Sequence, residues 1–88
     1  MRDITIHITR DEMHELIDAT EPIELLEAIG YFTTWGLTSM NYDTVNIHRD
    51  WHDKTDLVAI YTDTANPGNR FTMGAVWRNE RKQFTFHS

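Results

Sequence analysis

The chain has 88 residues, 40% of them hydrophobic, and carries 14 acidic against 8 basic side chains, for a formal net charge of −6. A chain of this length builds one hydrophobic core, and its apolar fraction excludes a disordered protein, so we expect residues 1–88 to form a single domain. The lack of cysteine excludes disulfides, thiolate metal sites and a cysteine nucleophile and suits a cytoplasmic protein, and no apolar run reaches the roughly 18 residues of a membrane span.

The N-terminal part of the chain is predicted to form one strand and two helices. Residues 3–9, DITIHIT, alternate isoleucine with polar residues, which is typical of a strand with one buried face. Thr9 and Glu12 are then predicted to form a capping box at the start of a helix. Pro22 suits the first turn of a second helix, which Gly36 is expected to end in a left-handed conformation. The expected buried stripes of the two helices are Met13, Leu16 and Ile17, and then Leu25, Leu26, Ile29 and Phe32.

From residue 42 onward, a period of two predicts four further strands. They are TVNIHRDW at 44–51, LVAIYTD at 57–63, RFTMGAVWR at 70–78 and QFTFHS at 83–88. Short polar connections separate them, which predicts an antiparallel meander. The expected fold is α+β in the order βααββββ, with two helices packed on one face of a mainly antiparallel sheet.

Glycine and tryptophan positions add two expectations about this sheet. Gly74 lies in the middle of a predicted strand and indicates a bulge or the close approach of a helix or another backbone. Trp77 is in phase with the apolar face of the same strand and is predicted to be in the core. Trp35 and Trp51 lie near the ends of predicted elements, in the core or at the rim of a binding surface.

Histidines and carboxylates are concentrated in HRDWHDKTD, residues 48–56. If the strand continued through residue 52, His48, Asp50 and His52 would share one face, about 7 Å apart in succession. Two histidines and a carboxylate are the ligand set of non-haem iron sites. Metal ligands must converge to about 2 Å from the ion, however, which a straight strand prevents. A polar hairpin turn is therefore the preferred interpretation, and a small metal-dependent enzyme or metal-binding protein is the alternative.

Other catalytic motifs are absent from the sequence. The four glycines are too far apart for a phosphate-binding loop, and HELID at 14–18 lacks the second histidine of a metalloprotease helix. We therefore expect a protein without a cofactor or resident metal that is not an enzyme.

Charge is distributed unevenly along the chain. Residues 1–30 carry eight acids and two arginines, whereas residues 70–88 carry four basic residues and one acid. The acids recur at helical spacing, so they form either a solvated helix face or a row of charges that resembles the phosphates of a nucleic acid. The net negative charge disfavours direct binding to nucleic acid.

The leading hypothesis is a small, acidic, non-enzymatic module that docks on a basic surface of a partner protein. The predicted partner-binding residues are Asp11, Glu15, Asp18, Glu24, Glu27, Trp35 and Trp51. In size, charge and general plan the chain resembles phage-encoded inhibitors and toxin-neutralising immunity proteins, which implies a regulatory or an immunity role. A homodimer is a further alternative, because the edge strands of an open sheet present unpaired backbone amides.

Overall fold

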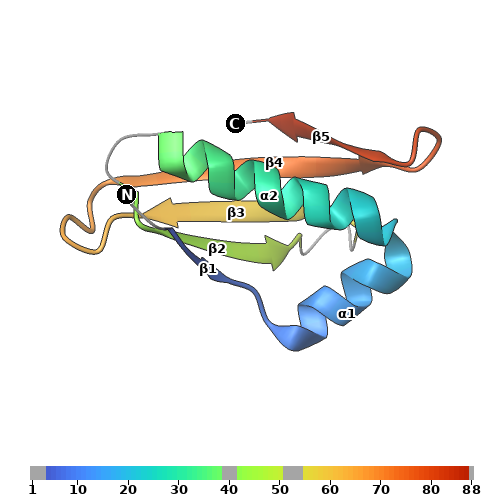
Figure 1. Cartoon of the computed structure of the whole chain (residues 1–88), viewed down its shortest axis with the longest axis horizontal. Helices are drawn as coiled ribbons and strands as arrows, with labels where there is room; N and C mark the ends of the chain where they lie inside the picture. Colours follow the sequence, from blue (N-terminus) through green and yellow to red (C-terminus); the bar gives the residue numbers. More distant parts are fainter. Residues whose placement is uncertain (1–3, 39–41, 51–54, 88) are drawn as a thin grey trace.

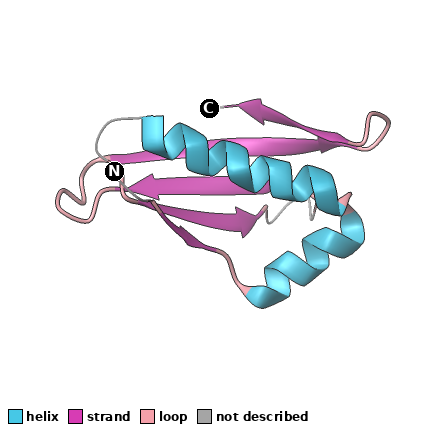
Figure 2. Cartoon of the chain, in the orientation of Figure 1, coloured by secondary structure: helices cyan, strands magenta, loops and turns pink. Residues whose placement is uncertain are grey.

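The computed structural model describes residues 4–38, 42–50 and 55–87, which form a layer of helices on one face of a sheet (Figures 1 and 2). The elements are β1 (Thr5–His7), α1 (Arg10–Ala19), α2 (Pro22–Thr38), β2 (Thr44–Arg49), β3 (Leu57–Thr62), β4 (Arg70–Arg78) and β5 (Gln83–His87). The predicted α+β class, with two helices against a mostly antiparallel sheet, is confirmed. No helix in the described ranges is long and apolar enough to cross a membrane.

The five strands lie side by side in the order β1-β2-β3-β4-β5. Strands β2 to β5 form antiparallel neighbours, whereas β1 pairs in parallel with β2, so the sheet is mixed. A parallel pair requires a crossover connection, and α1 and α2 supply it. Strands β1 and β5 are the two edges of the sheet.

The core lies between α2 and the inward-facing residues of the sheet. Cross-strand register places Val45 opposite Tyr61 and Ala59 opposite Met73, so buried residues of neighbouring strands share one face. The Tyr61 hydroxyl donates a hydrogen bond of 2.6 Å to the Phe32 carbonyl, which ties the sheet to α2. The predicted core position of Trp77 is confirmed. The largest fully buried side chains are Leu16, Leu25, Phe32, Val45, Ile47, Leu57 and Tyr61.

Gly36 does not end the second helix, contrary to the prediction. Helix α2 continues to Thr38, and none of the described glycines has a positive φ. A Cβ at Gly36 would collide with the side chain of Ile4 and would lie 3.0 Å from the ring of Tyr61. Glycine is present because the helix approaches the sheet closely here.

Gly74 likewise accommodates a neighbour. The pairing of β4 with β3 and β5 continues through Gly74 in regular register, so the strand contains no bulge at this position. A Cβ at Gly74 would lie 2.5 Å from Cε1 of His87, the residue directly across on β5. The sequence predicted that a helix or another backbone lies close to Gly74. A close neighbour is present, but it is the imidazole ring of His87 on β5.

Candidate functional site

The exposed face of the helical layer carries most of the predicted partner-binding acids. Asp11 and Asp18 are exposed on α1, and Glu27 is exposed on α2. The Glu15 carboxylate pairs with the guanidinium of Arg49 on β2, so part of its charge is neutralised within the molecule. Glu24 is half-buried and, with Glu27, borders a hollow between α2 and β5.

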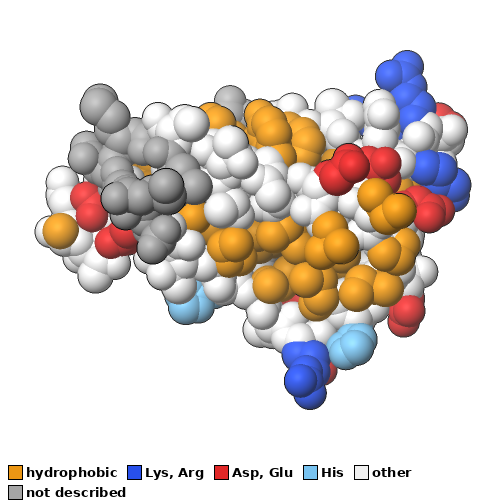
Figure 3. Space-filling view, in the orientation of Figure 1, with side chains coloured by type: hydrophobic (Ala, Val, Ile, Leu, Met, Phe, Trp, Pro, Cys, Tyr) orange, Lys and Arg blue, Asp and Glu red, His pale blue; other side chains and the backbone are white. Residues whose placement is uncertain are grey.

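Three apolar side chains lie exposed among these acids, and we call Ile17, Ile23 and Leu26 the apolar patch. Ile23 is 70% exposed, Leu26 63% and Ile17 39%. Ile23 and Leu26 are at i and i+3, which places them on the same side of α2. Figure 3 shows apolar side chains gathered where α1 and the first half of α2 lie, with acidic groups at the margin.

The exposure of Leu26 and Ile17 corrects two expectations from the sequence. The helical periodicity predicts both in the buried stripes of their helices, whereas the structure turns them to solvent. Adjacent helical residues differ by about 100° in direction, so Leu25 and Leu26 cannot both point at the core. The sequence does contain a signal for this surface, because a helix that is apolar nearly all round is typically covered on both sides.

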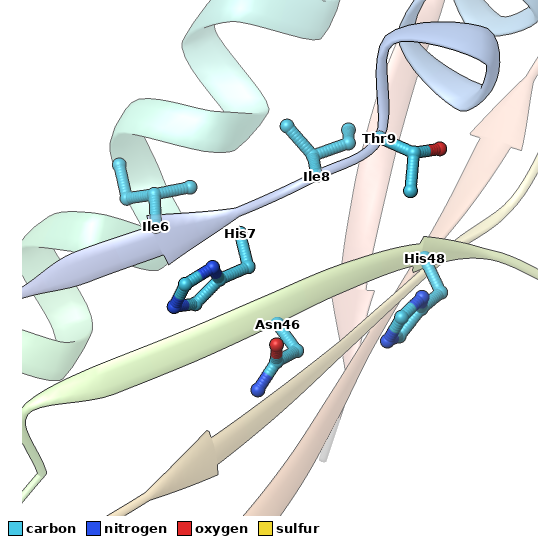
Figure 4. Close-up of a pocket in the computed structure, with 6 residues that line it drawn as sticks. All are labelled: Ile6, His7, Ile8, Thr9, Asn46 and His48. Carbon is cyan, nitrogen blue, oxygen red and sulfur yellow. The ribbon is translucent and has the colours of Figure 1, made fainter.

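The first strand is also less buried than predicted. Ile4 and Ile8 pack at the border of the core, but Ile6 is 39% exposed because the helices do not extend over it. Figure 4 shows Ile6 and Ile8 on one side of β1 and the His7 side chain on the other. Strand β1 is therefore a short, partly uncovered edge.

A small hollow of about 310 Å³ lies beside β1, where the chain diverges from β2. His7, Asn46 and His48 point to the sheet face that the helices leave open (Figure 4). The hollow is lined by Ile6, His7, Ile8, Thr9, Asn46 and His48.

Glu12 lies beside this hollow and joins α1 to β2. Its carboxylate accepts hydrogen bonds from the backbone N–H of Arg49 at 2.8 Å and from the Thr9 hydroxyl at 3.0 Å. Its Oε1 lies 3.7 Å from Nδ1 of His48. Burial raises the pKa of the Glu12 carboxyl, but the hydrogen bonds from Arg49 and Thr9 and the nearby His48 together outweigh burial and lower the pKa.

The alternative metal site receives no geometric support from the described residues. Strand β2 ends at Arg49, so Asp50 does not continue the strand alternation that would align it with His48. His52 lies outside the residues that the structure describes. Among those described, no three histidine or carboxylate side chains lie close enough to hold an ion. The Asp50 N–H donates to the Asp56 carbonyl at 2.9 Å, as residues flanking a hairpin connection do.

Of the two tryptophans predicted to bind a partner, only Trp35 lies in the part of the chain that the structure describes. Trp35 is half-buried, and its ring stacks on Phe71 with a centroid distance of 4.8 Å. It also contacts the rings of Tyr42 and Tyr61, so it belongs to an aromatic cluster at the border of the core. Trp51 lies outside the described residues.

The sheet face opposite the helices differs from the helical layer in the charged side chains of its strands. The strand residues with this orientation include no aspartate or glutamate, and the described ionisable ones are His7, His48, Arg70, Arg78 and His87. The carboxylates of α1 and α2 therefore have no counterpart among the described strand residues of the opposite face.

Comparison of the chain with protein-family models, with curated proteins and with solved structures found no match. Function must therefore be inferred from the chain's own surfaces.

Proposed function

We propose that this protein is a small, non-enzymatic binding module that docks on a partner protein through its helical face. The apolar patch forms the centre of the contact, and Asp18, Glu21 and Glu27 form its acidic margin. The single observation that carries the proposal is the exposure of Ile23 and Leu26, at 70% and 63%, on one side of α2. An exposed apolar cluster rimmed by polar residues is the usual mark of an interaction site.

The patch and its margin would contribute in different ways. Complete burial of an isoleucine or leucine side chain is worth about 1.5–3 kcal/mol, so Ile23 and Leu26 would supply much of the affinity. The carboxylates would mainly raise the association rate and select partners with lysine and arginine around an apolar centre. This division of roles extends the acidic docking surface predicted from the sequence.

The occupant that fits best is a different protein with a basic surface. Two copies of this chain, each with a net charge of −6, would bring acidic margins together and repel each other. An anionic membrane surface would be repelled in the same way. A phage-type inhibitor and an immunity protein would both use such a surface, and the identity of the partner would separate these roles.

Site-specific photo-crosslinking in the native cells tests the proposal. A photo-crosslinking amino acid would replace Leu26 in one variant and Thr72, exposed on the open sheet face, in the matched control. We expect an adduct with a basic protein from position 26 but not from position 72, and that protein, once purified, should bind the wild type. Equal adducts from both positions, no adduct from position 26, or an adduct with only a second copy would contradict the proposal.

A further inference from the structure

Gly30 lies on the outer side of α2, seven residues after Ile23 and four after Leu26, and is exposed. These spacings place the three residues along one side of the helix. A glycine in the middle of a helix lowers its stability relative to alanine. Its presence therefore requires a reason.

No contact within the described chain supplies that reason. A Cβ built at Gly30 meets no atom within 4 Å, whereas a Cβ at Gly36 of the same helix would collide with Ile4. Gly30 does not have a positive φ either, so its backbone conformation is open to any residue. The structure explains the glycine at position 36 but leaves the one at position 30 without an internal role.

We propose that the partner contacts this protein with an α-helix that crosses α2 at Gly30. The inference rests on the proposed function and adds the form of the partner element. Two helices pack 8–10 Å apart, depending on the side chains at the crossing, and a glycine permits the closest approach. Ile23 and Leu26 would then pack beside the crossing point.

The acidic margin determines which side chains the partner helix would carry. Asp18 and Glu21 lie near the junction of α1 and α2, and Glu27 lies on α2. The partner helix would therefore carry lysine or arginine flanking a stripe of leucine or isoleucine. A partner in extended conformation would need a free strand edge for backbone pairing, and α2 offers none. The occupant is thus a basic amphipathic helix.

Two synthetic peptides of about 18 residues and equal composition provide the probe. In the first, leucine recurs at i, i+3, i+4 and i+7 among lysines, which favours a helix, and in the second, leucine and lysine alternate, which favours a strand. Binding would be measured by amide chemical-shift mapping and by calorimetry. We expect the helical peptide to shift amides of α2 around Leu26 and Gly30 and to bind at least about tenfold more tightly.

Matched variants locate the crossing point. Gly30→Gln adds a long, uncharged side chain that favours a helix, and we expect it to weaken binding of the helical peptide at least about tenfold without unfolding the protein. Thr72→Gln, on the open sheet face, is the control and should leave the affinity unchanged.

The outcomes separate the inference from the proposed function. If the helical peptide binds and Leu26→Ser abolishes that binding, but Gly30→Gln has no effect or the alternating peptide binds equally well, the helix inference is wrong and the docking surface stands. If neither peptide shifts the amides of the apolar patch at millimolar concentration, the helix inference is wrong, and crosslinking from position 26 decides the docking surface by itself.

Discussion

The carboxylate of Glu12, in the first turn of α1, accepts a hydrogen bond of 2.8 Å from the backbone N–H of Arg49, the last residue of β2. Strand β1 ends at His7, opposite Asn46, and does not extend far enough along β2 to pair with Arg49. The Glu12 carboxylate therefore accepts the hydrogen bond of the Arg49 N–H in place of a strand. A charged side chain at such a position also discourages pairing with another chain. Glu12 therefore binds the N-cap residue Thr9 at the start of α1 and also covers the edge of the sheet.

Replacing Glu12 by alanine should lower the free energy of unfolding by about 1–3 kcal/mol, because it leaves the Arg49 N–H without its acceptor and weakens the start of α1. Chemical denaturation at pH 7 measures the effect. Asp11→Ala is the matched control, since Asp11 is exposed in the same turn, and it should cost less. Equal losses would mean that the contact with Arg49 contributes nothing.

The same carboxylate predicts a pH dependence of stability. The folded protein lowers the Glu12 pKa below its ordinary value of 4.5, so the unfolded state takes up a proton first as pH falls. The resulting stabilisation is complete above the unfolded pKa and is lost as pH falls through the lowered folded pKa. In denaturation curves across this range, Glu12→Gln should therefore lose less stability than the wild type. Parallel decreases in the two proteins would assign the acid sensitivity to other groups.

Gly30→Ala and Gly36→Ala should have opposite effects, although they are the same substitution in one helix. At Gly30 there is free space, so alanine should stabilise the protein by about 0.5–1 kcal/mol through helix propensity. At Gly36 the added methyl meets Ile4 and Tyr61, and overpacking of about 1–3 kcal/mol should exceed that gain. Thermal and chemical unfolding of the two variants give the signs, and stabilisation at both positions would show that α2 does not press against the sheet.

Tyr61→Phe should destabilise the protein by about 0.5–1.5 kcal/mol, because it removes the hydroxyl whose hydrogen bond to the Phe32 carbonyl joins the sheet to α2. Burial raises the pKa of Tyr61 well above its usual range, so this phenol should stay protonated in alkaline titrations monitored by absorbance. Tyr31→Phe, at an exposed position, is the control for the loss of a hydroxyl. Similar unfolding energies for the two variants would refute the role of this bond.

Reversing the acidic margin with Asp18→Lys, Glu21→Lys and Glu27→Lys should weaken binding of the basic helical peptide and reduce its dependence on salt, since exposed charges act mainly through screened electrostatics. The melting temperature should change little, because all three side chains are exposed. Glu15 and Glu24 are left intact because the first pairs with Arg49 and the second is half-buried. Unchanged peptide affinity at low salt would exclude an electrostatic contribution from the margin.

The sequence predicted the fold class well, because alternation in the strands and capping at Thr9 are local signals. It did not predict that Gly36 continues the helix, since only the closeness of Ile4 and Tyr61 explains that glycine. It also placed Leu26 in the core, because a helix that is apolar nearly all round does not reveal which side faces the sheet. The sequence also does not reveal that Ile23 and Leu26 are exposed, because this depends on how the helices dock on the sheet.

The apolar patch on the helical face is the proposed binding site for a partner. The most direct test is isothermal titration of the purified partner, identified by crosslinking from position 26, into the wild type, Ile23→Ser/Leu26→Ser and the control Thr72→Ser. The double variant should bind at least about tenfold more weakly, with an unchanged melting temperature, and the control should bind as the wild type does. Equal affinity of the double variant and the wild type would contradict the claim.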